Sequence, residues 1–523
     1  MSYPPPPHGS GNSTGPVNPG YQGNPGNVGG YATPTPQHGQ PVQGNGPYPQ
    51  QGWQQPPPAP PTPPGDSGDG KGFKRVVIGL VVVAVLAVFG VGGLALYQTL
   101  GGASMSATDE SGGEEIVSDE EIASLLVGRT KALAGGDEEE YLAPFTGKAK
   151  DTQRKIFKNL RKLPLEEAKY KVIKQTGSGT DEYGSDDVSV SLDIAFVHQI
   201  KGVDVRPVSE WYRWTISKET ADDEPRITEV GGSPSAYGTK SAVFYPAPWD
   251  VYDDMYVKRG QNSIIIGDKK NSASIGRYAP IVDRAAKSDL SLWKSKGPGT
   301  ENTPNSFLVI LEPDRKKYIE LYNASKDDVG YDAGQSVPMP AFNENFRGGK
   351  DEKLDYGGAR IKIDTSSTQF KGSAWKRGVA AVSRHEIAHA LVQPLDLGTY
   401  TAFGPGDNSV RTWVAEGFGE YFGLRGDREY AEWSVKSGTE DLNFDGKLPD
   451  DDFEMANSVG ANYALSYLAI KFIADKAGEE AALGFVAAHY QKPKNIDQQL
   501  QNATGMGKQE FEAAWAEYVR SKL

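Results

Sequence analysis

The chain contains no cysteine, which excludes disulfide bonds, thiolate metal ligands, iron–sulfur clusters and a cysteine nucleophile. Histidine is scarce as well, with 6 residues in a chain of 523, so a close pair of histidines is informative. Basic side chains are outnumbered, since 55 Lys and Arg against 68 Asp and Glu give a net charge of -13. General nucleic-acid binding needs a basic surface that meets the phosphates, so this charge argues against it.

Residues 1–72 hold more than half of the 36 prolines, together with many Gly, Gln and Asn. Such a segment has too little apolar surface to offset the entropy that is lost on ordering, so we expect a disordered tail. Its proline-rich runs fit either a docking site for a proline-recognising partner or a solvated spacer.

The run 76–96 has no charged or strongly polar residue and would be about 31 Å long as a helix, enough to cross a bilayer. Basic residues within 71–75 precede it, and acidic residues follow it. The positive-inside rule therefore predicts a single-pass anchor over 73–99 in the cell membrane, with the tail and any partner of the tail in the cytoplasm. The rest would be extracellular, after a linker over 100–115. A cleaved signal peptide is the alternative.

The segment 116–235 combines helical sequence with strand-like alternation. Ser118 and Glu121 fit a capping box at the start of a helix, which glycines at 135–136 would end. Apolar residues then alternate with polar ones over 188–196, as expected of a half-buried strand. Helices followed by antiparallel strands predict a small α+β domain, and this order resembles the nuclear-transport-factor-2-like cone fold.

The strongest chemical signal is an HExxH motif formed by His385, Glu386 and His389. An amphipathic pattern from Ser373, a suitable N-cap, to Leu391 predicts a helix around the motif. Residues four apart on a helix lie one above the other, so the two imidazoles would face the same way and could bind one Zn²⁺. The glutamate beside them could then reach a water on the metal.

A catalytic zinc needs a third protein ligand and one open position. Glu416 is the candidate, because the segment 413–421, WVAEGFGEY, has a carboxylate, aromatic residues and glycines at helical spacing. Gly417 and Gly419 would let this second helix approach the first closely. Glu420, one turn after Glu416, could accept a hydrogen bond from the free ring nitrogen of a ligand histidine and fix its orientation.

HEIAH followed by WVAEGFGEY resembles the gluzincin metallopeptidases, the thermolysin-like group, and most of all bacterial proteins with a peptidase MA-like domain. The resemblance covers residues 236–523. It implies a thermolysin-like domain in which the two motif histidines and Glu416 bind zinc and Glu386 is the general base.

Enzymes of this group commonly use a Tyr or His to stabilise the tetrahedral oxyanion. Tyr463 is the best candidate for that role, with Tyr467 and His489 behind it. By the same resemblance, the strand 360–363 could pair with an extended substrate, as edge strands do in this type of enzyme.

Residues 441–452 fit the template of a calcium-binding loop, with oxygen-bearing side chains at Asp441, Asn443, Asp445 and Asp452. A Ca²⁺ site is one interpretation of this segment, and an acidic surface loop is the other.

These patterns together predict an α+β protein with a disordered tail, one transmembrane helix, a small cone-like domain over 116–235 and a gluzincin peptidase domain over 236–523. The expected function is that of a membrane-anchored, extracytoplasmic zinc peptidase acting on a peptide or protein substrate. Endopeptidase action is the default, because no anchor for a free amine is recognisable. The alternative is a membrane-tethered binding or sensory protein that holds zinc without cleaving. The oligomeric state stays open.

Overall fold

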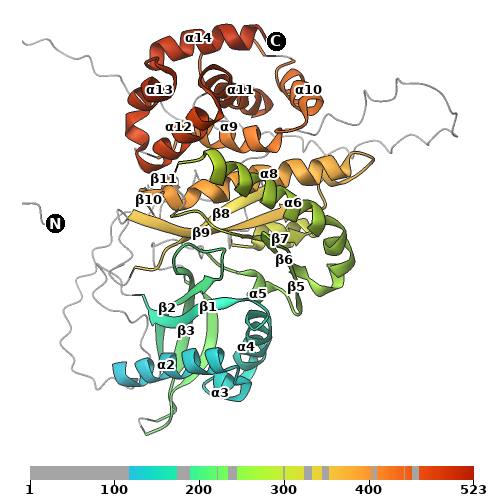
Figure 1. The fold of residues 1–523 in the computed structure, drawn as a ribbon. Coiled ribbons are helices and arrows are strands. Elements are labelled where there is room, and N and C mark those ends of the chain that lie inside the picture. Colours follow the sequence, from blue (N-terminus) through green and yellow to red (C-terminus); the bar gives the residue numbers. More distant parts are fainter. Residues whose placement is uncertain are drawn as a thin grey trace, which may run out of the picture. The chain divides into compact units, whose positions relative to one another are not determined.

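The computed structural model describes residues 117–173, 189–220, 222–233, 244–298, 301–322, 332–343, 353–401, 404–405, 409–440, 442–449 and 459–523. The tail, anchor and linker predicted over 1–72, 73–99 and 100–115 lie outside these residues. All of the described residues belong to one compact unit. They form a mixed α/β structure of helices and two sheets, shown in Figure 1.

The predicted fold class and membrane location need correction on one point. From residue 117 onward, within the described ranges, no helix is both long and apolar enough to cross a membrane. The longest of these helices, α6 (Ser272–Lys296), carries Arg277, Asp283 and Lys287 along its length. The predicted single-pass anchor, and the cytoplasmic and extracellular sides assigned from it, are therefore not supported.

The first part of the structure joins three helices to a four-stranded antiparallel sheet with strand order β1-β2-β3-β4. The elements are α2 (Asp119–Gly135), α3 (Glu138–Leu142), α4 (Gly147–Leu160), β1 (Leu165–Val172), β2 (Ser189–Ile200), β3 (Val208–Ser217) and β4 (Arg226–Gly232). The predicted start of the first helix is confirmed, because Ser118 and Glu121 form a capping box. Its predicted end is confirmed by Gly136, which adopts a left-handed conformation with φ of 78°.

The second sheet has the order β11-β10-β9-β7-β6-β5, and β8 pairs with β9 as well. Its strands are β5 (Met255–Arg259), β6 (Ser263–Asp268), β7 (Phe307–Glu312), β8 (Gly334–Pro340), β9 (Lys353–Asp364), β10 (Leu397–Thr401) and β11 (Gly404–Pro405). Strands β6, β7 and β9 run parallel, whereas β8 is antiparallel to β9. The segment 360–363 therefore lies between β7 and β8 and is not the edge that the sequence suggested. The edge at that point is β8.

Helix α8 (Trp375–Val392) lies between this sheet and the C-terminal helices (Figure 1). Helix α9 (Thr412–Gly423) packs between α8 and α11 (Val459–Ala477). The remaining helices are α5 (Pro248–Val251), α7 (Arg315–Glu320), α9 (Thr412–Gly423), α10 (Arg428–Gly438), α11 (Val459–Ala477), α12 (Glu479–Gln491), α13 (Ile496–Thr504) and α14 (Lys508–Arg520). Apolar side chains of α8 such as Val379, Ile387 and Leu391 are fully buried, which contributes about 1.5–3 kcal/mol each. This burial holds the motif helix in place.

The β2–β3 hairpin joins the two sheets. Arg360 of β9 donates hydrogen bonds of 2.7 and 3.1 Å to the carboxylate of Asp204 at the hairpin, and both side chains are fully buried. Arg360 also lies 3.2 Å from Nε2 of His198, whose Nδ1 is 3.0 Å from Glu210. One hydrophobic core contains residues from both sides of the predicted domain boundary at 235–236, from Val117 to Tyr356. The hairpin is thus anchored in the second sheet.

Candidate metal centre

His385 and His389 lie on α8, one turn apart on the same face, as the HExxH spacing predicts. The helix begins at Trp375, and Ala374 occupies the N-cap position in place of the expected Ser373. Both residues are 2% exposed, and their Nε2 atoms are 3.0 Å apart. Two imidazole nitrogens are therefore held together away from bulk water.

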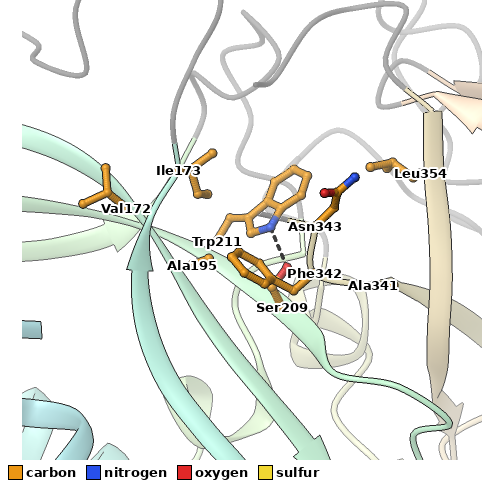
Figure 2. Close-up of a pocket in the computed structure, with 9 residues that line it drawn as sticks. All are labelled: Val172, Ile173, Ala195, Ser209, Trp211, Ala341, Phe342, Asn343 and Leu354. Atoms are coloured by element: carbon orange, nitrogen blue, oxygen red, sulfur yellow. Dashed lines mark hydrogen bonds between the residues drawn. The ribbon is translucent and has the colours of Figure 1, made fainter. Parts of the chain in front are cut away.

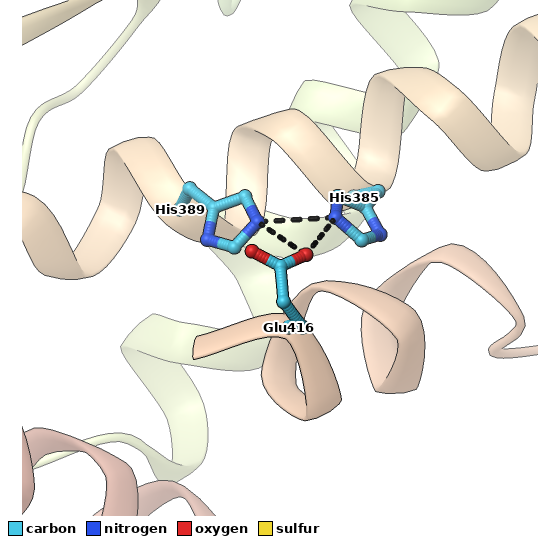
Figure 3. Close-up of side chains that lie close together, drawn as sticks. All are labelled: His385, His389 and Glu416. Carbon is cyan, nitrogen blue, oxygen red and sulfur yellow. Dashed lines mark hydrogen bonds and ion pairs between the residues drawn. The ribbon is translucent and has the colours of Figure 1, made fainter. Parts of the chain in front are cut away.

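Glu416 comes from α9 and points at the same two nitrogens (Figure 3). Its Oε2 lies 3.3 Å from Nε2 of His385 and 3.8 Å from Nε2 of His389. The carboxylate is 1% exposed. These three side chains could hold a metal ion, and they are the only group of at least three His, Asp or Glu side chains with that geometry in the described part of the chain.

Glycines of α9 allow the close approach of the helices. A Cβ on Gly417 would lie 2.4 Å from the carbonyl oxygen of Ser466 on α11. A Cβ on Gly419 would lie 2.7 Å from Cε1 and Nε2 of His385. The sequence interpretation is therefore confirmed for Gly419, which faces the ring of His385 on the motif helix, whereas Gly417 faces α11 instead.

Replacing Gly419 by alanine is expected to weaken metal binding by about tenfold or more, because the ring of His385 must move out of the way. Competition with a chromophoric chelator measures the change. The matched control is Gly484→Ala on α12, where a Cβ would have nothing within 4 Å. That control should keep the parent affinity and gain about 0.5–1 kcal/mol of helix stability. Unchanged metal affinity in Gly419→Ala would contradict the role of the contact.

Glu420 lies behind the first histidine, as its position one turn after Glu416 predicts. Its Oε1 is 3.2 Å from Nδ1 of His385. A carboxylate at that nitrogen favours a proton on Nδ1, which leaves the lone pair of Nε2 free for a metal. The arrangement therefore sets both the tautomer and the direction of the imidazole.

The electrostatics of the site are those of charged groups buried close together. Burial raises the pKa of Glu386 to about 8 and also raises the pKa of Glu416. Burial opposes protonation of His385, but the nearby carboxylates of Glu416 and Glu420 outweigh it and raise the pKa of the ring well above its usual value. The pKa of His389 is well below its usual value because of burial and the neighbouring charge of His385.

Glu386, the predicted base, is completely buried on α8 beside the first ligand. Neither of its carboxylate oxygens has a hydrogen-bond partner among the described residues. A Cβ on Gly334, at the start of β8, would lie 2.8 Å from both Cγ and Oε1 of this side chain. An uncompensated buried carboxylate is unfavourable, and a cation nearby would offset that penalty.

The other candidate residues are Tyr463 and Tyr467 on α11 and His489 on α12. Tyr463 on α11 is 2% exposed, and its ring centroid is 6.3 Å from that of His385. Tyr467 is also buried, at 8% exposed. Its phenol has a pKa raised to about 12 by burial. His489 instead contacts the backbone at the start of α9, a contact that residue spacing did not reveal.

The proposed calcium loop is described only in part. Asp441 and Asp452 lie outside the described residues. Asp445 accepts a hydrogen bond of 2.9 Å from the backbone N–H of Lys447, as in an ordinary turn. The Ca²⁺ prediction stays a prediction.

A cavity of about 30 Å³ lies between the two sheets, where Trp211 donates a hydrogen bond of 2.9 Å to Ser209 (Figure 2). That volume accommodates one or two water molecules, and none of the metal-centre residues lines it. It is therefore too small to serve as a substrate pocket.

No protein-family model matches the chain, and a comparison with curated proteins gives no match. A functional conclusion therefore has to rest on the chemistry of the metal centre.

Proposed function

We propose that this chain is a zinc-dependent peptidase of the gluzincin type. The observation that carries the proposal is the buried cluster formed by the side chains of His385, His389 and Glu416 beside the carboxylate of Glu386. The motif histidines on one helix and a glutamate on a later helix resemble the ligand set of that group.

Zinc is the metal that best fits these donors. Zinc takes imidazole nitrogen and carboxylate oxygen at about 2.0–2.2 Å in tetrahedral geometry, which requires donor atoms about 3.3 Å apart. The three separations here are 3.0, 3.3 and 3.8 Å. With Zn²⁺ bound, two neutral imidazoles and one carboxylate would leave the site with a net positive charge, which would also compensate the unpartnered carboxylate of Glu386.

When bound, zinc supplies a Lewis acid that lowers the pKa of a water and polarises the scissile carbonyl. Glu386 accepts the proton of the attacking water and donates it to the leaving amine as the C–N bond breaks. Glu420 keeps the imidazole of His385 oriented through its contact with Nδ1. Tyr463 lies beside the ligand His385, with ring centroids 6.3 Å apart, and it is our candidate for stabilising the oxyanion.

The substrate in this proposal is an extended peptide or protein segment. Strand β8 is the edge strand beside α8, and Gly334 at its start contacts the predicted base. Edge strands bind extended chains by adding a strand to the sheet, so β8 takes the role that the sequence assigned to 360–363. Endopeptidase action remains the default.

One observation favours a second candidate. All four site residues are between 0% and 2% exposed, as expected of a closed structural metal site. The alternative is therefore a zinc-containing binding protein that does not cleave.

Chelation separates the two candidates. Zinc-free protein is expected to lose hydrolysis of an unfolded protein substrate, and one equivalent of zinc is expected to restore it. Mass spectrometry of the products would show internal cleavage. Protein that holds one zinc per chain but cleaves neither unfolded proteins nor a peptide library would overturn the peptidase proposal in favour of the binding protein.

A further inference from the structure

His489 lies on α12 and is completely buried, yet it takes no part in the metal centre. Its Nε2 accepts a hydrogen bond of 3.0 Å from the backbone N–H of Arg411. Arg411 is the N-cap residue of α9, the helix that carries Glu416, and its own side chain does not cap the helix. A distant helix thus holds the start of the ligand-bearing helix.

Gln499 fixes the tautomer of this histidine. Its Nε2 donates hydrogen bonds of 2.9 and 2.8 Å to the carbonyl oxygens of Ala488 and Lys492. Its Oε1 therefore faces Nδ1 of His489, at 2.9 Å, and an amide oxygen can only accept. Nδ1 must then carry the proton, which leaves the lone pair of Nε2 for the N–H of Arg411.

A second contact ties the same turn of α9 to α12. Trp413 stacks on Phe485, with ring centroids 5.9 Å apart and an angle of 22° between the rings. Phe485 lies one turn before His489 on α12, and these two rings are also nearly parallel. Helix α12 therefore contacts the first turn of α9 through both backbone and side chain, immediately before Glu416.

We propose that His489 is a positioning residue for the third metal ligand, Glu416, and this inference rests on the proposed zinc site. Metal–ligand distances are held to within about 0.2 Å, so a small displacement of the first turn of α9 moves Glu416 out of range. The neutral, single tautomer of His489 holds Arg411, and with it the helix, at the position that brings the carboxylate to the two imidazoles.

Two pairs of variants test the hydrogen bond in the full chain. His489→Leu removes the acceptor, whereas His489→Gln places an amide oxygen where Nε2 was. Arg411→Pro removes the donor N–H at a residue whose φ of -63° suits proline, whereas Arg411→Ala removes only the side chain. His489→Leu and Arg411→Pro should each weaken zinc affinity by about tenfold or more, and the two conservative variants should stay within about threefold of the parent.

Zinc affinity is measured by chelator competition, and urea unfolding of the zinc-free proteins is measured beside it. If the hydrogen bond only stabilises the fold, His489→Leu and Arg411→Pro will have a lower unfolding midpoint but an unchanged zinc Kd in the folded protein. That result would overturn the inference. If His489→Leu does not fold, the Arg411 pair decides, because equal affinities of Arg411→Pro and Arg411→Ala would overturn it as well. Failure to bind zinc in the parent, or parent affinity in Glu416→Ala, would instead contradict the proposed zinc site.

Discussion

Replacing Glu386 by glutamine is expected to leave the metal bound and to lower kcat for peptide hydrolysis by about 10²–10⁴-fold. Glutamine has nearly the same shape but cannot accept the proton of the attacking water. The side chain is completely buried, and no other described residue gives its oxygens a hydrogen bond, so its acid–base function has no obvious substitute nearby. Turnover with an unfolded protein substrate and metal content by mass spectrometry are the two measurements.

The control for this variant is Glu510→Gln, an equivalent change at an exposed position in the first turn of α14. It should keep both the metal and the parent rate. Parent turnover in Glu386→Gln would rule out the proposed base. Loss of metal together with activity would show instead that Glu386 helps to hold the site together.

Replacing Asp204 by alanine is expected to lower the free energy of unfolding by about 3–5 kcal/mol, because it leaves the guanidinium of Arg360 buried without a counter-charge. The same change removes the acceptor of the backbone N–H of Ile200, at 2.8 Å. Urea denaturation of the zinc-free protein measures the loss.

A double variant distinguishes the cost of an unpaired buried charge from the cost of altered side-chain packing. Asp204→Val combined with Arg360→Met removes both charges, so it should be more stable than Asp204→Ala alone. A loss below about 1 kcal/mol in Asp204→Ala would show that the pair does not anchor the β2–β3 hairpin in the second sheet.

The metal centre could be predicted from the sequence because its signals are local. HExxH places two histidines on one face of a helix, and the helical spacing of Glu416, Glu420 and the glycines of α9 describes the facing surface. The second helix needed only to lie beside the first. The close approach of Gly419 to the ring of His385 shows how the sequence permits that arrangement.

The contacts that position the centre could not be predicted in this way, because their partners are far apart in the chain. Arg411 and His489 are separated by 78 residues, and Arg360 and Asp204 by 156. Neither pair leaves a periodic pattern in the sequence. Strand β8 was missed for a related reason, since its sequence GQSVPMP contains two prolines and lacks strand-like alternation.

The single-pass anchor was inferred from an apolar run and its flanking charges, over a segment that lies outside the described residues. In the described ranges the long helices carry charged residues among their apolar ones, as α11 does with Lys471 and Asp475. Helix α11 is buried along most of its length and packs against α9, α10 and α12.

The metal content of the purified full chain, beside that of Glu416→Ala, tests the central claim most directly. Protein produced in zinc-supplemented medium without chelator is analysed by mass spectrometry under native conditions. The account predicts one zinc per chain in the parent, and its loss or a sharp weakening of its binding in the variant. A parent free of zinc, or a variant that retains zinc with the parent affinity, would contradict the three-ligand site formed by His385, His389 and Glu416.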